Sequence, residues 1–393
     1  MKLRLVNLTY FGFYIDLFGA TGCVTDPDKI TFRFTSDELK ELKDAIAKQE
    51  DMFLLYAFLE PWSPNAINIV LELLGVTPNQ ANVILLLDKL VLNKTTIARK
   101  LVEERLPKPD GSSDNDINFD KVIFYDYFAA MSGLYEDEFG SNQIINLEPR
   151  NFLFLMGKPY GSVRITLLHE LYKRKLLSNS MWSFHYDEQL KEITKSRLPF
   201  LTDSEFDSFV NATARKLDNV EFRIGKDRSF FLGYPIDPLL YASSSFSIIS
   251  ETINWFPGFI TEKTWRTISN NHAFVIASCQ ETVTYLESLG LDTFRYMIKT
   301  QSPAGSLEIQ HYDNIVANQT EEFIERINDN KHKLEQSIRH NHTVFRSIVD
   351  DQRQTVDKIL EPILKDRCYQ YWAKSQYTIE GEDAKHCIAK LWC

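Results

Sequence analysis

Short apolar runs alternate with amphipathic segments along most of the chain. In the first part, apolar runs predict strands at 2–9, 52–59, 81–87 and 121–125. Amphipathic spacing between these runs predicts helices at 35–49 and 65–74. The run at 52–59 is almost continuously apolar, as in a strand that is covered on both faces. This alternation of strands and helices indicates a parallel, Rossmann-like sheet.

The same pattern starts again after residue 150. An apolar run predicts a buried strand at 152–156, and the next segment predicts a helix at 162–176. Residues 178–188 could form a further strand. Beyond them lie a polar and largely helical stretch, a β-rich stretch, and a stretch of loop and turn, at 188–217, 220–234 and 235–245. The chain therefore repeats the α/β theme of its first part.

The clearest pattern comes next. Two apolar runs predict strands at 246–250 and 273–278, and a helix follows each of them. Thr261 stands where an N-cap belongs, just before the first helix. The second helix is predicted at 281–289, and Gly290 occupies the C′ position that glycine favours. Two consecutive βα units predict parallel strands that present ligand-binding residues at their carboxyl ends.

The pattern changes again toward the C-terminus. Long charged stretches with sparse apolar residues predict helices at 319–340 and 344–366, separated by a turn at 339–343. The aromatic-rich tail at 369–393 is expected to dock on the body of the protein. A chain of 393 residues suggests about two domains. The expected organisation is two Rossmann-like domains and a set of closing helices, at 1–148, 149–320 and 321–393.

Polar residues gather where the strand at 246–250 ends and the next helix begins. Glu251 follows the strand directly, and Thr261, Glu262 and Lys263 open the helix. A helix start offers backbone N–H groups and the positive end of the helix dipole, which favour an anion such as a diphosphate. Lys263 would add a cation for the phosphates, and Glu251 or Glu262 could bind ribose hydroxyls. An ordinary helix cap with solvated charges in its first turn explains the same residues.

A second group of cations lies near the start of the helix at 162–176. Lys158 lies in the preceding loop, and Arg164 falls in the first turn. Both cations could face the same diphosphate as Lys263, since the strands that precede the two helices belong to one predicted sheet. Solvated surface cations are the alternative interpretation.

The segment 246–294 resembles the donor-binding segment of α-1,3-fucosyltransferase-like enzymes and of related glycosyltransferases of large viruses and bacteria. The resemblance rests on an ordered set of motifs: Ser250-Glu251, Thr261-Glu262-Lys263, the small apolar strand at 273–278, and Leu289-Gly290 followed by Thr293-Phe294. The loop with Lys158 and the position of Arg164 are also similar to that family. The resemblance implies the B-type glycosyltransferase fold, in which two Rossmann-like domains face each other across a cleft.

The resemblance also implies an activity. The chain would move a hexose or pentose from a nucleoside-diphosphate sugar to an acceptor hydroxyl, with inversion. We expect no metal and no other cofactor, because Arg164, Lys158, Lys263 and a helix start would meet the donor phosphates. The acceptor could be a glycan, a protein or a modified nucleobase. One general base must take the acceptor proton. The candidates are carboxylates near strand ends in the first domain, in the order Glu60, Asp126 and Asp16. Each of them could equally cap a helix or meet solvent.

Composition narrows the functional classes. The net charge of −10 argues against a chain-wide cationic surface for nucleic acid. The five cysteines are scattered and lack metal-site spacing, which favours a reducing compartment, taken here as the cytoplasm, and no structural metal site. No apolar run reaches the roughly 20 residues of a membrane span. Asp114 and Asp116 have the spacing of a metal-binding pair, but their Gly- and Ser-rich surroundings favour a surface loop.

Two other functional classes remain open. A non-catalytic nucleotide- or sugar-binding protein needs the same donor residues but no general base. A dehydrogenase is disfavoured, because no Gly-x-Gly-x-x-Gly motif follows a predicted first strand. The two glycines at Gly157 and Gly161 have the wrong spacing for that motif.

Overall fold

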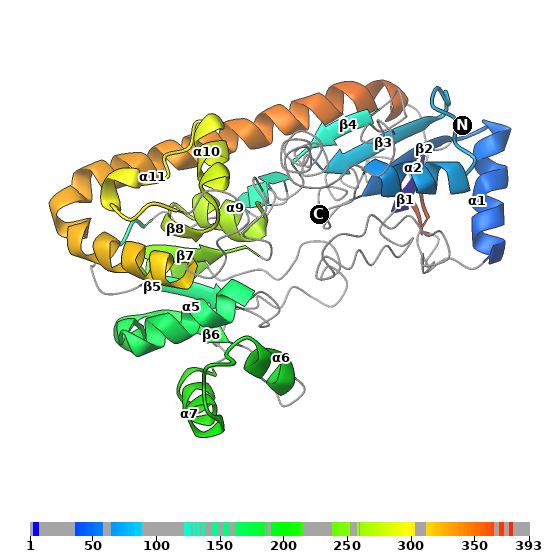
Figure 1. Cartoon of the computed structure of the whole chain (residues 1–393). Helices are drawn as coiled ribbons and strands as arrows, with labels where there is room; N and C mark the ends of the chain where they lie inside the picture. Colours follow the sequence, from blue (N-terminus) through cyan, green and yellow to red (C-terminus); the bar gives the residue numbers. More distant parts are fainter. Residues whose placement is uncertain are drawn as a thin grey trace, which may run out of the picture. The chain divides into compact units, whose positions relative to one another are not determined.

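The computed structural model divides the chain into two compact units, Met1–Ala130 with Asp351–Trp392 and Met131–Asp350 with Cys393 (Figure 1). The expected domain boundaries at 148 and 320 stay predictions. The structure describes residues 3–7, 36–57, 64–88, 122–126, 129–130, 132–133, 136–137, 144–147, 152–156, 162–184, 186, 190–214, 238–251, 258, 260–302, 312–364, 369–372 and 377–379. Each unit has its own sheet.

The first unit is built on a six-stranded sheet in the order β10-β9-β1-β2-β3-β4. All neighbours are parallel except β9 and β10, which are antiparallel. The strands are β1 (Leu3–Asn7), β2 (Met52–Ala57), β3 (Val83–Asp88), β4 (Val122–Tyr125), β9 (Tyr369–Trp372) and β10 (Tyr377–Ile379). Two helices accompany them, α1 (Ser36–Lys48) and α2 (Pro64–Leu73). Phe53, Leu55 and Leu85 are completely buried, as the continuous apolar runs predict.

The elements predicted in the first unit are confirmed within a few residues at their ends. The C-terminal part differs from the prediction, because helices alone were expected at 321–393 and residues of the tail form β9 and β10. β9 pairs with β1, so the two ends of the chain share one sheet. Alternating aromatic residues such as Tyr369 and Tyr371 are the strand signal in that tail. The expected mixed α/β class with parallel sheets is confirmed.

The second unit is built on a four-stranded parallel sheet in the order β6-β5-β7-β8. The strands are β5 (Phe152–Met156), β6 (Met181–Phe184), β7 (Phe246–Ser250) and β8 (Ala273–Ala277). The chain leaves β5 toward one edge to form β6, and it leaves β7 toward the other edge to form β8. The strand order therefore reverses between β5 and β7. Such a reversal is the place where open parallel sheets bind ligands, at the carboxyl ends of the strands.

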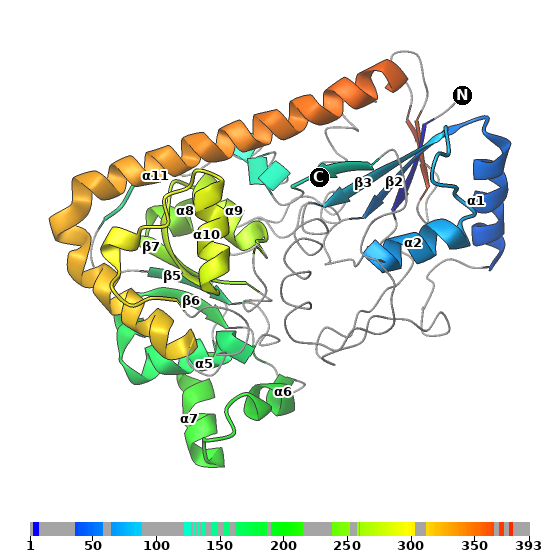
Figure 2. The ribbon, with the colours of Figure 1, turned by 45° about the horizontal axis from the view of Figure 1, so that its top comes forward.

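Helices flank this sheet on both halves. Figure 2 shows α5 beside the β5–β6 half, and α9 and α10 beside the β7–β8 half. The helices are α5 (Ser162–Lys173), α6 (Lys191–Ser196), α7 (Asp203–Thr213), α8 (Pro238–Ala242), α9 (Glu262–Ser269) and α10 (Gln280–Ser288), with 3-10 turns η3 (Leu176–Asn179) and η5 (Arg295–Met297). Gly290 follows α10 with a φ of 88°, as its predicted C′ position requires. The loop and turn predicted at 235–245 are wrong in part, because α8 lies there.

α11 (Tyr312–Leu364) is one continuous helix of 53 residues. The turn predicted at 339–343 is therefore wrong. Residues 339–343 contain no Gly or Pro that would break a helix. They continue the helix and contact the loop between α10 and η5. His340 Nε2 lies 2.8 Å from the Gly290 carbonyl oxygen, and the Asn341 side chain donates to the Asp292 carbonyl oxygen. Residues of α11 up to Asp350 belong to the second unit, and those from Asp351 belong to the first.

Among the described residues, no helix combines the length and the apolar character that crossing a membrane requires.

A short segment around Gly133 packs tightly on α11 within the second unit. A Cβ atom at position 133 would lie 2.5 Å from Val349 Cγ1, closer than two carbon atoms can approach. Val349 is fully buried and β-branched, so its side chain has little freedom to move away. Polar contacts reinforce this packing: Arg346 forms an ion pair with Asp137 at 2.9 Å, and His342 Nε2 lies 2.7 Å from Glu136 Oε1. Glycine at this position permits the close approach.

We expect Gly133→Ala to lower the free energy of unfolding by about 1–3 kcal/mol, because the added methyl group overpacks a buried contact. Urea unfolding measures this change. In the Val349→Ala background the same substitution should cost clearly less, because the opposing methyl groups are gone. An equal cost in both backgrounds would contradict the assigned contact.

Candidate functional site

The candidate site lies at the carboxyl end of β7, where the strand order of the second sheet reverses. Residues from two helices meet there. α5 follows β5 and carries Arg164 in its first turn, and α9 follows β7 and begins just after Thr261. The Arg164 Nε–H donates to the Ser250 carbonyl oxygen at 3.1 Å. This hydrogen bond joins the start of α5 to the end of β7, so the two groups of residues predicted separately are brought together.

Glu251 is the buried carboxylate of this site, with its side chain completely excluded from solvent. Its Oε1 accepts the Thr261 backbone N–H at 2.9 Å and the Thr264 hydroxyl at 2.8 Å. Its Oε2 accepts the Thr261 hydroxyl, and the Lys263 Nζ lies 3.7 Å from the same oxygen. A buried carboxylate needs such partners, because burying an unpaired charge is costly. Both oxygens of Glu251 are thus engaged within the protein.

Hydrogen-bonding groups at the start of α9 also have partners within the protein. Thr261 is the N-cap, as predicted, and its Oγ1 accepts the Lys263 backbone N–H at 3.4 Å. The Lys263 Nζ donates to Thr261 Oγ1 at 3.1 Å and to Glu262 Oε1 at 3.0 Å. The N–H group of Thr261 donates to Glu251 rather than to the outside. The Lys263 side chain is 26% exposed, so it remains accessible to an external anion.

Glu262 is the carboxylate of the site that reaches solvent, with 28% of its side chain exposed. Burial acts to raise the pKa of Glu262, but the charges of Lys263 and Arg266 outweigh this effect and lower the pKa to about 2. Glu262 is therefore ionised at neutral pH. An exposed, ionised carboxylate can accept hydrogen bonds from ligand hydroxyl groups.

The site has a small positive charge. Arg164 and Arg266 are 7% and 4% exposed, and Lys263 has 26% of its side chain exposed. Burial lowers the pKa of Arg164, and the carboxylates of Glu251 and Glu262 oppose this effect. Arginine stays charged even so. The three cations and two carboxylates leave one net positive charge, which suits a ligand that combines an anion with hydroxyl groups.

Two members of this site were not singled out from the sequence. Arg266 lies one helical turn after Glu262, at the spacing that pairs opposite charges on a helix. Thr264 supplies the third hydrogen bond to Glu251. The repeated threonines around Lys263 were the available signal, since hydroxyl groups near a helix start commonly bind carboxylates or backbone groups.

Three of the predicted site residues, Lys158, Glu60 and Asp16, lie outside the described residues. Their assigned roles stay predictions. The remaining candidate base, Asp126, follows β4 at the edge of the first sheet. Its Oδ1 accepts the Ala129 backbone N–H at 2.9 Å, and its own N–H donates to the Gln352 side chain. Asp126 thus has the capping role that the sequence suggests as the alternative to a general base.

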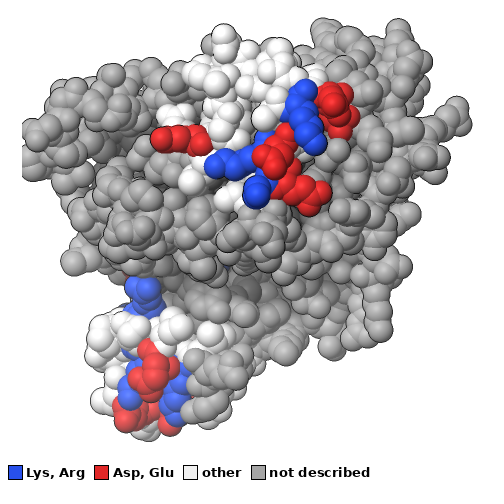
Figure 3. Space-filling view, turned by 90° about the vertical axis from the view of Figure 1, so that its right-hand side faces the viewer, with Lys and Arg blue, Asp and Glu red and all other residues white. Residues whose placement is uncertain are grey.

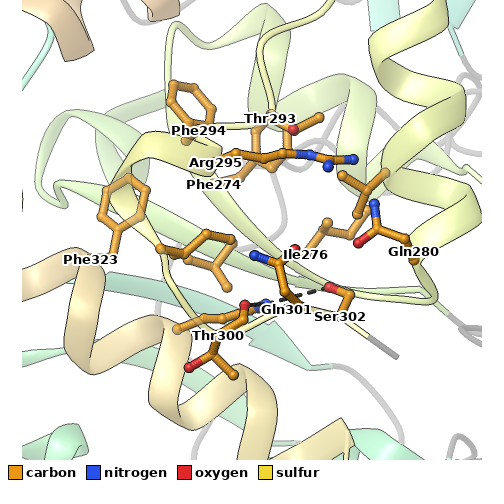
Figure 4. Close-up of a pocket in the computed structure, with 14 residues that line it drawn as sticks. Phe274, Ile276, Gln280, Thr293, Phe294, Arg295, Thr300, Gln301, Ser302 and Phe323 are labelled. Carbon is orange, nitrogen blue, oxygen red and sulfur yellow. Dashed lines mark hydrogen bonds between the residues drawn. The ribbon is translucent and has the colours of Figure 1, made fainter. Parts of the chain in front are cut away.

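A separate small pocket lies beside β8, the edge strand of the second sheet. Figure 4 shows its mixed lining, which includes Phe274, Ile276, Gln280, Phe294, Arg295 and Phe323. None of its lining residues belongs to the group around Glu251. Arg295 is paired with Glu287 at 2.6 Å. The pocket is therefore not part of the candidate site.

The described surface carries mixed charge. On the face drawn in Figure 3, described basic and acidic side chains lie intermingled in two groups. Within the described part of the chain, no three His, Cys, Asp or Glu side chains are grouped so that they could hold a metal ion.

His272 is a buried titratable residue at the start of β8, away from the carboxyl ends where the site lies. Its Nε2–H donates to the Ser244 carbonyl oxygen at 2.9 Å, which leaves Nδ1 to accept the Ser247 hydroxyl at 2.8 Å. The ring is thus held neutral in one tautomer. Burial lowers the pKa of His272 to about 4.

No protein-family model and no curated protein sequence matches the chain. Among solved structures, two trehalose-phosphate synthases are similar over much of the chain. A UDP-forming enzyme from Burkholderia vietnamiensis has 10% sequence identity and a TM-score of 0.34, with 78% of this chain and 70% of that chain covered. An enzyme from Burkholderia multivorans has 10% identity and a TM-score of 0.28, with coverages of 86% and 79%. Similarity at this level supports no conclusion about activity.

We expect His272 to make the second unit less stable in mild acid. The pKa of His272 is about 4 in the folded chain, compared with 6.5 ordinarily, so the unfolded chain binds a proton that the folded chain excludes. Stability is retained above pH 6.5 and is lost as the pH falls toward 4, by about 3 kcal/mol at most. Amide hydrogen exchange of β7 and β8 measures this loss. His272→Gln should flatten the pH dependence between these values, and an unchanged dependence would contradict the assignment.

Proposed function

We propose that the chain is a glycosyltransferase that moves a sugar from a nucleoside-diphosphate sugar to an acceptor hydroxyl, with inversion and without a metal ion. The main support is that Arg164 binds the end of β7, and that Lys263 pairs with a partly exposed Glu262 at the start of the following helix, at the reversal point of a parallel sheet. The resemblance of residues 246–294 to the donor segment of fucosyltransferase-like enzymes points the same way. The α/β class with two parallel sheets is compatible with the B-type fold.

The proposed chemistry needs positive charge at the leaving group. When the acceptor oxygen attacks the anomeric carbon, the bond between that carbon and the diphosphate oxygen breaks, and negative charge develops on the diphosphate. Lys263 and Arg164 would stabilise this charge. Side-chain cations can thus take the role that a divalent metal has in other transferases. Lys158 would add a further cation from the loop before α5.

The two carboxylates would have different roles. Glu251 is completely buried and engaged by Thr261 and Thr264, so it has little capacity left for a ligand. Glu262 is exposed in part and ionised. We therefore assign the ribose hydroxyls to Glu262 and not to Glu251.

The general base would be one of Glu60, Asp126 and Asp16, in that order. The base takes the proton that the acceptor hydroxyl loses during attack. Asp126 already caps the turn that includes Ala129, which favours the other two candidates. The acceptor would be a glycan, a protein or a modified nucleobase.

The second candidate function is a nucleotide- or sugar-binding protein without turnover. The contact of Asp126 with the Ala129 N–H favours it, because a binding protein needs no free general base. The two functions differ in whether a donor sugar is consumed.

We expect one nucleoside diphosphate and its sugars to raise the melting temperature of the protein selectively. A ligand at a hundred times its dissociation constant adds about 2.7 kcal/mol of stability, which a thermal-shift panel detects. Lys263→Ala and Arg164→Ala should each weaken binding by about tenfold or more, since each removes a charged hydrogen bond to the ligand. Lys195→Ala is the matched control, because Lys195 lies in the same unit and pairs with the surface residue Asp203. No shift with any nucleotide would contradict the proposal.

Glu60→Gln should abolish transfer while it leaves donor binding intact, because glutamine keeps the size of the side chain but cannot accept the proton. General bases contribute about 10²–10⁴-fold to a rate. Transfer to a panel of acceptors is measured together with donor binding. Full activity of Glu60→Gln would remove Glu60 as the base, and Asp16→Asn, which likewise keeps the side-chain size, would then be the next test.

A further inference from the structure

A series of hydrogen bonds leads from the side chain of Glu251 to that of Lys263. Glu251 Oε2 accepts the hydroxyl proton of Thr261. A hydroxyl group has one proton to donate, so the lone pairs of Thr261 Oγ1 are left to accept hydrogen bonds. Both the backbone N–H and the Nζ of Lys263 donate to this oxygen, at 3.4 and 3.1 Å. The buried carboxylate thus determines which way the Thr261 hydroxyl points, and that hydroxyl in turn receives the ammonium group of Lys263.

From this series of hydrogen bonds we propose that Glu251 and Thr261 are a positioning pair. The pair holds the Lys263 ammonium group in place in the site without touching the ligand. The inference rests on the proposed function of Lys263 as an anion-binding residue. It assigns Glu251 and Thr261 a role different from the ligand contacts that the sequence suggests.

Positioning matters for lysine because its side chain has many rotamers. A free lysine loses this freedom when it binds an anion, and the loss weakens binding. Thr261 and the carboxylates of Glu251 and Glu262 already restrict the rotamers of the Lys263 side chain. Its side chain is still 26% exposed, so the ammonium group remains accessible to a ligand.

A simple helix cap is the competing explanation for the same hydrogen bonds. A cap stabilises the whole start of α9, so its loss would disturb the site whether or not Lys263 is present. A positioning pair acts only through Lys263. The two explanations therefore differ in whether the effects of changing Thr261 and Lys263 are independent.

The first test needs no ligand. Competitive acetylation with mass spectrometry compares the reactivity of Lys263 with that of Lys173, whose side chain is 66% exposed. Thr261→Val keeps the size of the side chain and removes the hydroxyl, so Lys263 should become severalfold more reactive. Thr261→Ser keeps the hydroxyl and should leave the reactivity unchanged. Thr213→Val, which removes a buried hydroxyl from α7, is the matched control. Equal reactivity of Lys263 in the wild type and in Thr261→Val would overturn the proposal.

The second test is a double-mutant cycle on the affinity for the nucleoside diphosphate that the wild type binds. Thr261→Val should weaken binding by about tenfold in the wild-type background. In the Lys263→Met background it should have no further effect. An equal loss in both backgrounds would overturn the proposal and leave Thr261 as a cap. If the wild type binds no nucleoside diphosphate, the proposed function fails, and the acetylation result alone decides the positioning pair.

Discussion

The burial of the Glu251 carboxylate is the constraint on which the candidate site depends. A negative charge without contact to water must be met by donors, and here the donors come from the first turn of α9. The loop between β7 and α9 therefore has to return to the end of the strand. This return places Lys263 and Glu262 beside the strand end, and the same strand end receives Arg164 through the Ser250 carbonyl group. A single buried charge thus organises contributions from two helices.

The reversal of strand order explains why these contributions converge. Because β6 and β8 lie on opposite sides of the β5–β7 pair, the connections after β5 and β7 diverge and leave room at their carboxyl ends. The first unit has its own reversal, between β1 and β9, since β2, β3 and β4 follow β1 in one direction. Asp16 follows β1 in the sequence and lies outside the described part of the chain.

Strands and long helices could be predicted from the sequence because their signals are strong and local. β5 and β7 were predicted with their observed ends, since continuous apolar runs bounded by polar residues allow few alternatives. α8 was missed because five residues carry too little periodicity, and the uninterrupted course of α11 depends on contacts with the α10–η5 loop. At the site, Thr261 was predicted as the N-cap of α9, but the hydrogen bonds of its side chain and N–H group to Glu251 were not predicted. Whether the Thr261 N–H faces a ligand or Glu251 depends on the fold of the loop between them.

The pairing of β9 with β1 has a consequence for synthesis on the ribosome. The sheet of the first unit joins strands that lie before and after the second unit in the sequence, so β9 is made only after the second unit. The second unit is continuous from Met131 to Asp350 and can fold before then. Domains nearer the N-terminus usually fold first during synthesis. Here the second unit can be complete before the first. Until β9 arrives, β1 has an open edge, which is a surface that chaperones and other unpaired strands recognise.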